Sequence, residues 1–387
     1  MRSLAGGAIL LGAGAGACGS DGDDDDDGPS PTEAALAAPD PSPTPTQEPI
    51  ASPVPGYADP TKWEGRTLSI ASLGSDYQDA QAQAYFEPFA AATGAEVVQR
   101  QMDLGRLREQ VQRGEVTWDV ADVPTEEVLP LSRESYLTQI DYQVVDKTTL
   151  YPEVCMQHGV GSAFFSTVLA FPAEATAKPE GWADFWRTAA FGEGRALYRS
   201  PIGTLEFALM ADGVEKTDLY PLDVERAFKS LDKIRPSVVE WYQNARQPVA
   251  LVLNGDAALA SAWNVFVTTD GAEAVGIQWN GGMLSADSWV VPRGTPNEDV
   301  AMDFINFATR AVTSANFARI VPFGPVNTEA FALLRPDRLP LLPNAAPQFN
   351  AQFFQGWNYW ADHKADLVER FEDWLLSEPE GTPVAAS

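Results

Sequence analysis

The chain has 387 residues and a formal net charge of −28, and 45% of its residues are hydrophobic. This length suits two domains of about 150 residues each, and the hydrophobic fraction allows a sizeable core. So negative a charge argues against nucleic-acid binding, which needs a basic face, and against a basic patch for anionic lipid. With two His and two Cys, a zinc site of the usual type is not expected, and we expect no other metal or cofactor.

The first 18 residues have the pattern of a secretory signal. Arg2 precedes a weakly apolar run, Leu4–Ala17, which is too short to span a membrane as a helix. The run ends in AGAC at Cys18, which resembles a bacterial lipobox, although Ala15 stands where a Leu is usual. We therefore expect Cys18 to carry lipid. The alternatives are an ordinary secretory signal, or a start site assigned too far downstream.

Residues 19–60 have the composition of a tether. Residues 21–27 read DGDDDDD, and ten Pro lie between positions 29 and 60. Because like charges repel and Pro forbids regular structure, we expect a disordered, extended segment. If Cys18 is lipidated, Cys155 has no partner for a disulfide, and we expect it to be a small buried apolar residue.

Strand and helix patterns open the globular part. Leu68–Ala71 predicts a first strand. A helix capped by Ser75 or Asp76 is expected to run to Ala92, with Pro88 kinking or shortening it. Further strands are predicted at 97–98, 118–123 and 168–171.

The same alternation continues to the C-terminus. Asp223 is a good cap for a helix over 224–231, and Asn297 for one with apolar residues from 300 to 308. Strands are predicted at 195–198, 257–262, 276–279 and 288–291. Alternating strands and helices predict an α/β fold with largely parallel sheets flanked by helices. We find no internal repeat and no transmembrane span.

The usual signatures of enzymes are missing, so we expect no catalytic activity. There is no G-x-S-x-G elbow, P-loop, G-x-G-x-x-G behind a strand, or H-E-x-x-H. Cys155 and His158 are close in sequence, but this spacing does not establish a nucleophile and its base. A structural role for His158 is expected.

Aromatic and acidic residues gather instead at the ends of predicted strands. Asp76 and Tyr77 follow the first strand, Trp263 follows another, and Asp287 precedes SWVV. In α/β proteins ligands bind beyond the carboxyl ends of strands and between domains. Aromatic faces with carboxylates suit an amine, through cation–π contacts and charge-assisted hydrogen bonds. Taken singly, most of these aromatics also fit a core.

Six segments extend this pattern into a family resemblance. They are KPEGWADFW (178–186), LEFALMADGV (205–214), LYPLDVERAF (219–228), SAWN (261–264), SADSWVVPRGTPN (285–297) and FGPVN (323–327). In order and spacing they resemble the spermidine/putrescine-type extracellular solute-binding proteins of ABC importers, over roughly Leu68 to Leu375. Together the six are specific for the family but not for the ligand.

The resemblance implies a two-lobed periplasmic-binding-protein-like fold of type II. Each lobe would be a mostly parallel sheet flanked by helices, joined by two hinge crossings near Gly161–Phe171 and Trp289–Thr295. Hinge closure around a ligand gives the importer one shape to recognise. We expect a lipid-anchored monomer, in the periplasm or on the outer face of the bacterial cytoplasmic membrane, that delivers its solute to an ABC permease. The expected division is 1–18 signal with lipobox, 19–60 tether, 61–165 lobe one, 166–290 lobe two, 291–375 return to lobe one with C-terminal helices, and 376–387 disordered tail.

The family's polyamine site carries over only in part. Two positions depart from it: Gly203 stands where a second lobe-two acid is usual, and Ser285 where a second Trp is usual. Losing one acid and one stacking face favours a diamine, an amino-acid-derived cation or another small polar solute over a long polyamine. The matching positions, expected to bind the ligand, are Asp76, Tyr77, Glu206, Trp263, Asp287 and Phe323, with Phe323 replacing a Tyr.

Three alternatives stay open. A ferric-iron binder commonly uses adjacent Tyr ligands, and the chain has no Tyr-Tyr pair. A small anion could bind main-chain amides at the helix start near Gly74 and Ser75. A secreted hydrolase on an α/β scaffold is disfavoured by the missing motifs.

Overall fold

The computed structural model describes residues 53–271 and 273–377. A nine-stranded mixed sheet runs through the whole molecule in the order β2-β1-β3-β8-β4-β7-β5-β6, and β9 pairs with β8. The strands are β1 (Thr67–Ser72), β2 (Glu96–Gln101), β3 (Val120–Pro124), β4 (Val160–Pro172), β5 (Arg195–Tyr198), β6 (Val238–Tyr242), β7 (Leu259–Trp263), β8 (Val275–Val290) and β9 (Phe353–Phe354).

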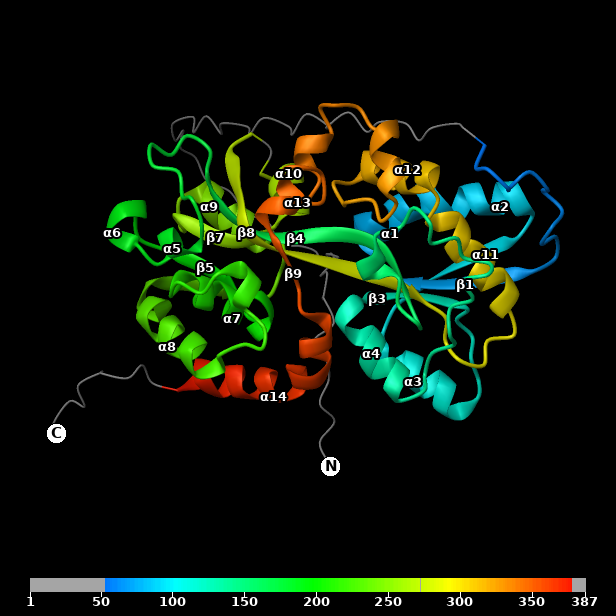
Figure 1. Ribbon diagram of the computed structural model, residues 1–387, viewed down its shortest axis with the longest axis horizontal. Coiled ribbons are helices and arrows are strands. Elements are labelled where there is room, and N and C mark those ends of the chain that lie inside the picture. Colours follow the sequence, from blue (N-terminus) through cyan, green and yellow to red (C-terminus); the bar gives the residue numbers. More distant parts are fainter. Residues whose placement is uncertain (1–52, 272, 378–387) are drawn as a thin grey trace, which may run out of the picture.

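The molecule has two lobes, and each holds one parallel part of the sheet (Figure 1). In the first lobe β1 pairs in parallel with β2 and β3, and in the second β5 pairs in parallel with β6 and β7. The long strands β4 and β8 lie antiparallel to each other and to their outer neighbours. The α/β, two-lobed prediction is therefore confirmed, with antiparallel strands where the chain crosses between the lobes.

Helices cover both lobes (Figure 1). Those of the first lobe are α1 (Ser75–Gln81), α2 (Glu87–Thr93), α3 (Leu104–Arg113), α4 (Thr125–Arg133), α11 (Glu298–Ala308) and α12 (Ala311–Ile320). Those of the second are α5 (Trp182–Phe185), α6 (Thr188–Phe191), α7 (Pro201–Ala211), α8 (Val224–Ile234) and α9 (Gln247–Asn254). The remaining helices are α10 (Asn264–Thr269), α13 (Gln348–Ala351) and α14 (Trp357–Leu376). The short helical turns are η1 (Ala82–Phe86), η2 (Pro152–Val154), η3 (Lys216–Asp218), η4 (Arg235–Ser237), η5 (Thr328–Leu333) and η6 (Leu339–Leu341).

The helix predicted to start near Ser75 forms as three joined pieces. A π-helical turn, η1, lies between α1 and α2. Pro88 occupies the first turn of α2, where its missing N–H costs nothing, so the helix changes pitch before it rather than ending. Gly94 ends α2 in the left-handed conformation, with φ of 77°.

The two strands predicted at 276–279 and 288–291 are one strand, β8. Thr167 pairs with Met283, whereas Leu169 pairs with Gln278, so residues 279–282 bulge out of the ladder. The Asn280-Gly281-Gly282 segment therefore marks an irregularity within a strand and not a turn between two. The strand predicted at 168–171 is likewise the last part of β4.

The C-terminal helix α14 joins the two lobes. Its buried residues Trp360, Leu367 and Phe371 lie in the apolar cluster of the second lobe, with Phe228 of α8. Its charged residues contact α4 of the first lobe through Asp362, Lys364 and their partners. Residues 291–375 were expected to return to lobe one. The apolar residues of α11 lie in the core of the first lobe, whereas the large aromatic residues of α14 lie in that of the second.

The segment predicted as a tether is shorter than expected at its C-terminal end. Val54 and Tyr57 are 8% and 6% exposed and belong to the core of the first lobe. The Tyr57 hydroxyl donates to the backbone oxygen of Asp303 at 2.8 Å. Burial of these two side chains orders residues 53–60, which were expected to be disordered. The expected signal, Cys18, the rest of the tether and the tail from 378 lie outside the described residues.

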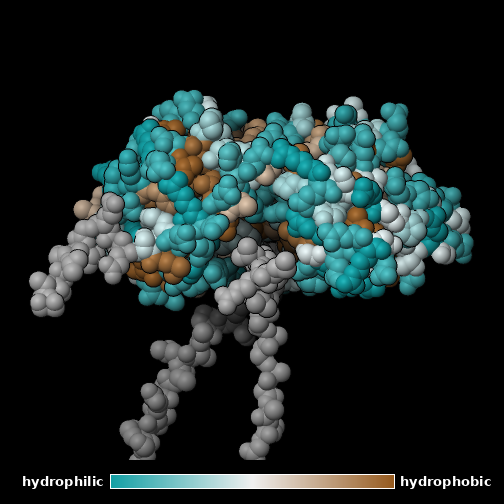
Figure 2. Space-filling model, turned by 90° about the horizontal axis from the view of Figure 1, so that it is seen from below, coloured by the Kyte–Doolittle hydropathy of each residue, from teal (hydrophilic) through white to brown (hydrophobic). Residues whose placement is uncertain are grey.

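The face of the molecule in Figure 2 is mainly hydrophilic, in agreement with the acidic composition of the chain. Figure 2 shows that hydrophilic residues dominate the face seen from below, with apolar residues in small separate groups. Within residues 53–271 and 273–377, no helix is long and apolar enough to cross a bilayer.

Candidate functional site

A row of five aromatic rings connects the two lobes. Tyr77 on α1 contacts Phe323, with ring centroids 4.9 Å apart, and Phe323 lies 6.3 Å from Phe165 on β4. Phe165 continues to Trp263 on β7 at 5.2 Å, and Trp263 to Tyr198 on β5 at 6.3 Å. The structure thus brings together the predicted Tyr77, Trp263 and Phe323. Phe165 and Tyr198 complete the row and were missed, because each reads as an ordinary strand aromatic.

Two buried carboxylates lie beside the first-lobe end of this row. In the β3–β8 ladder Asp287 is opposite Pro124, and Asp122 is opposite Trp289. Asp122 and Asp287 are therefore diagonal neighbours on one face of the sheet, a separation of about 7–8 Å between backbones that side chains shorten. They are 0% and 5% exposed. Asp287 was predicted from the sequence, whereas Asp122 was not.

Asp122 is held by three neutral donors. The Tyr77 hydroxyl donates to it at 2.8 Å, the Ser162 hydroxyl at 2.8 Å and Gln81 Nε2 at 2.7 Å. These bonds fix the position of the carboxylate without neutralising its charge. Through Tyr77 the acid pair and the aromatic row form one constellation.

The electrostatics of the pair favour a cation. Burial raises the pKa of Asp287 well above its usual range, and the charges of Asp122 and Glu126 raise it further. Burial also raises the pKa of Asp122, against the lowering effect of its three donors. No Lys, Arg or His in the described part of the chain forms an ion pair with either acid. Two desolvated carboxylates without a counter-charge repel each other, and a bound cation would relieve that repulsion.

Glu206 is bound to protein donors on all sides. It is fully buried on α7 and accepts from the Gly203 N–H at 2.9 Å, the Tyr220 hydroxyl at 2.6 Å and Trp360 Nε1 at 2.7 Å. Burial raises the pKa of Glu206 to about 6 in spite of these bonds. The structure thus places this predicted ligand residue in a network that ties α7 to α14.

Asp76 lies apart from the acid pair. Its side chain is 75% exposed and its carboxylate is 2.6 Å from Arg246 Nη2. The neighbouring amide that could hold an anion is also occupied, since the Gly74 N–H donates to Gln78 Oε1 at 3.0 Å. The Asp76 carboxylate and the Gly74 N–H are thus both engaged by protein groups.

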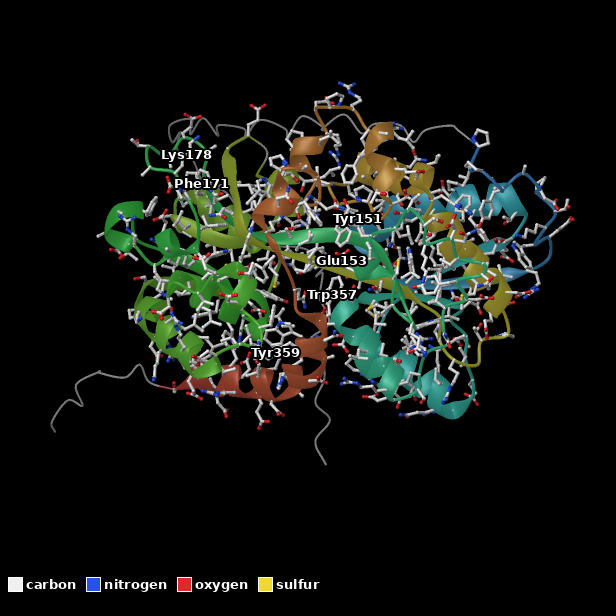
Figure 3. The ribbon with its side chains drawn as sticks, viewed as in Figure 1. Tyr151, Glu153, Phe171, Lys178, Trp357 and Tyr359 are labelled. Atoms are coloured by element: carbon white, nitrogen blue, oxygen red, sulfur yellow. The ribbon has the colours of Figure 1, made fainter. Side chains whose placement is uncertain are left out.

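Three buried donors near β8 and the start of α14 have no hydrogen-bond partner within the described residues. They are Ser285 Oγ, Gln355 Nε2 and Trp357 Nε1. Ser285 is opposite Phe165 in the β4–β8 ladder, and the Gln355 N–H donates to the Leu284 oxygen at 3.0 Å. Figure 3 shows Trp357 at the start of α14, between the two lobes. Buried polar atoms are normally paired, so these three donors would be available to an acceptor from outside the chain.

Cys155 and His158 do not form a catalytic pair. His158 Nδ1 lies 2.8 Å from Ser132 Oγ, whereas Cys155 Sγ contacts the Tyr151 oxygen at 3.4 Å. Burial lowers the pKa of His158 and raises the pKa of Cys155. Cys155, which was expected to be a small buried residue, is half-buried. Among residues 53–271 and 273–377, no group of three or more His, Cys, Asp or Glu is placed to hold a metal ion.

Comparison with known proteins identifies the family. A sequence profile for bacterial extracellular solute-binding proteins matches residues 84–344. The γ-aminobutyric acid-binding protein of Pseudomonas aeruginosa PAO1 is 32% identical over 329 residues, which cover 82% of this chain and 93% of that protein. The chain belongs to the bacterial extracellular solute-binding proteins. It is thus a substrate-binding protein of an ABC transporter, and the expected small-molecule solute and permease partner fit this family.

Two further relatives of this solute-binding protein bear on its ligand. The spermidine/putrescine-binding periplasmic protein of Escherichia coli K12 is 26% identical over 160 residues, which cover 40% of this chain and 45% of that protein. A solved structure described as the Atu4243-GABA receptor has a TM-score of 0.75 and 36% identity, and the match covers 80% of this chain and 97% of that one. The similarity to the γ-aminobutyric acid binders therefore spans far more of the chain than the similarity to the polyamine binder.

Proposed function

We propose that this solute-binding protein captures a short solute with one ammonium and one carboxylate group, of the ω-amino acid class that includes γ-aminobutyrate. The observation that carries the proposal is the buried pair Asp122 and Asp287 beside the aromatic row. An ammonium between two carboxylates gains charge-assisted hydrogen bonds, and the face of Tyr77 or Trp263 adds a cation–π contact.

The unpaired donors supply the other end of the site. A carboxylate has about four acceptor positions, and Ser285, Gln355 and Trp357 offer three donors that are otherwise unsatisfied. Leaving a buried donor unpaired costs about 1–3 kcal/mol, so an acceptor that reaches all three is strongly favoured.

This proposal narrows the range of cations expected from the sequence. A polyamine needs an acid for each amino group, but Glu206 is already bound to three donors and Gly203 adds no carboxylate. Two relatives with broad coverage are named for γ-aminobutyric acid, which has one amino group.

The same proposal includes closure about β4 and β8, with lobe boundaries near residues 165 and 290. Support comes from the ladder between these strands, whose register shifts between Gly161 and Ala163 and again between Thr167 and Leu169. Such irregularities are places where a sheet bends. Lipid attachment at Cys18 would hold the protein, as a monomer, at the outer face of the cytoplasmic membrane, where the permease takes up the solute.

A panel of four-carbon solutes tests the proposal by thermal shift and calorimetry on the purified protein. γ-Aminobutyrate should bind, whereas butyrate lacks the ammonium, butylamine lacks the carboxylate, and putrescine replaces the carboxylate by a second amine. We expect each of these three to bind at least about tenfold more weakly. Equal affinity for γ-aminobutyrate and butyrate would contradict the ammonium site, and stabilisation only by oxyanions or ferric iron would reject the proposed class.

A further inference from the structure

Lys364 on α14 carries an ammonium group into the acidic part of the first lobe. Its Nζ lies 2.6 Å from Glu127 Oε1 and 3.2 Å from Glu126 Oε1, both in the first turn of α4. The Lys364 side chain is 35% exposed, and each glutamate side chain is 12% exposed. Burial lowers the pKa of Lys364, but the two glutamates outweigh this effect and raise it, so the lysine stays charged.

This ion cluster adjoins the proposed site through short backbone links. Pro124, two residues before Glu126, is opposite Asp287 in the β3–β8 ladder. The hydroxyls of Thr125 and Ser288 are 2.8 Å apart. The start of α4 is therefore fastened to the strand that carries Asp287.

The electrostatic contacts agree with this placement. The charge of Glu126 contributes to the raised pKa of Asp287. At the far end of the aromatic row, burial raises the pKa of Tyr198, while Lys364 lowers it and Glu126 raises it. Glu126 thus acts on both Asp287 and Tyr198, and Lys364 acts on Tyr198 and pairs directly with Glu126.

The number of free acid sites separates two classes of solute. Asp122 and Asp287 lie close together and have no protein counter-charge in the described part of the chain, so they form one site, in which a single ammonium can lie between the two carboxylates. The other acid that acts on Asp287 is Glu126 at the start of α4, whose cation partner in the described part of the chain is Lys364, whereas Glu127 also has Arg108 at 3.9 Å. A second solute ammonium would therefore have to displace the lysine or lie unpaired beside it.

We infer that Lys364 is a specificity-determining residue: it occupies the place of a second solute amine and restricts this protein to solutes with a single ammonium group. The inference rests on the proposed function. It adds one side chain to the discrimination against diamines that the shortage of free acids already provides.

The test compares affinities for γ-aminobutyrate and putrescine in the wild-type protein and in Lys364→Met. The variant leaves Glu126 without a cation, so putrescine should bind at least about tenfold more tightly than to wild type, while γ-aminobutyrate changes by less than about threefold. Lys364→Arg keeps the charge and should keep the wild-type preference. Arg370→Met removes another ion pair of the same helix, with Glu225 at 2.8 Å, and should also leave the preference unchanged.

Two outcomes would overturn the inference that Lys364 excludes a second amine. The first is a folded Lys364→Met protein whose preference equals that of wild type, and the second is an equal gain for putrescine in Arg370→Met. If Lys364→Met does not fold, Lys364→Gln, which keeps a hydrogen-bond donor for Glu127, provides the same comparison. A wild-type protein that binds neither solute would instead reject the proposed function, so the two failures are distinguishable.

Discussion

The carboxylate of Asp76 lies 2.6 Å from Arg246 Nη2, and this ion pair joins the first lobe to the second. Asp76 is in the first turn of α1, and Arg246 directly precedes α9. Arg246 also contacts Asp270 at 2.6 Å and lies 4.7 Å from the ring centroid of Phe266, which stacks on Trp263. The pair therefore fastens the lobes beside the aromatic row.

Removing this pair should speed release of the solute. An exposed ion pair contributes about 0–1 kcal/mol, so Arg246→Met should raise the dissociation rate about two- to fivefold, measured by stopped-flow fluorescence of the tryptophans. At high salt wild type and variant should converge, because screening weakens the pair. Arg335→Met removes a local pair with Asp337 and should have no effect. Identical rates in wild type and Arg246→Met at low salt would show that the pair does not hold the lobes.

Neutralising Asp287 should stabilise the ligand-free protein. Asp287→Asn removes one of two desolvated carboxylates that repel each other. Because replacing a buried charge by a neutral group of similar size is often stabilising, we expect a gain of about 1 kcal/mol in the free energy of unfolding. Urea unfolding of wild type and variant measures this. A clear loss of stability would mean that the Asp287 carboxylate is part of the structural framework.

The buried acids should make the stability of the ligand-free protein, and its affinity for an amine, depend on pH in opposite directions. In the folded state the pKa values of Asp122 and Asp287 are raised, and that of Glu206 is about 6, whereas unfolded Asp and Glu have pKa values near 4. Between these values the folded state binds more protons than the unfolded state, so the free energy of unfolding of the ligand-free protein should fall as pH rises from about 4 to 7.

The affinity for an amine should rise over the same pH range, since binding of the solute ammonium needs ionised acids. Thermal melts with and without γ-aminobutyrate should give a larger ligand-induced shift at pH 7.5 than at pH 5, and a larger shift at pH 5 would contradict this account.

Glu206 should behave as a structural residue. Glu206→Gln keeps the shape but replaces one acceptor oxygen by a donor that faces Tyr220, Trp360 or the Gly203 N–H, which should cost about 1–3 kcal/mol of stability. Affinity for γ-aminobutyrate, measured well below the melting temperature, should change by less than about threefold. A folded variant with affinity reduced thirtyfold or more would restore Glu206 as a ligand residue.

Those residues of the proposed site that stand at strand ends could be predicted from the sequence. Tyr77, Trp263 and Asp287 each adjoin a recognisable strand, and ligands gather at such ends in α/β folds. Asp122 was missed because it lies inside the apolar run WDVADV, which reads as a buried strand. Its role depends on Gln81 and Ser162, which only the folded chain brings to it.

The roles of the other acids depended on partners far along the chain. Glu206 was expected to face the solute, but Trp360, 154 residues further on, donates to it. Asp76 was expected in the same site, but it meets Arg246, 170 residues away. Sequence patterns identify residue types at the predicted ends of helices and strands, but they do not show which distant side chain donates a hydrogen bond to a given acid.

The most direct test of the ammonium site is a calorimetric cycle with two proteins and two solutes. Wild type and Asp287→Asn are each titrated with γ-aminobutyrate and with butyrate, which differ only in the amino group. Removing the charge partner of a desolvated ammonium should cost about 2–5 kcal/mol, so Asp287→Asn should weaken γ-aminobutyrate at least about thirtyfold and leave butyrate nearly unchanged. Equal losses for both solutes, or no loss for γ-aminobutyrate, would contradict the assignment of the ammonium to the Asp122–Asp287 pair.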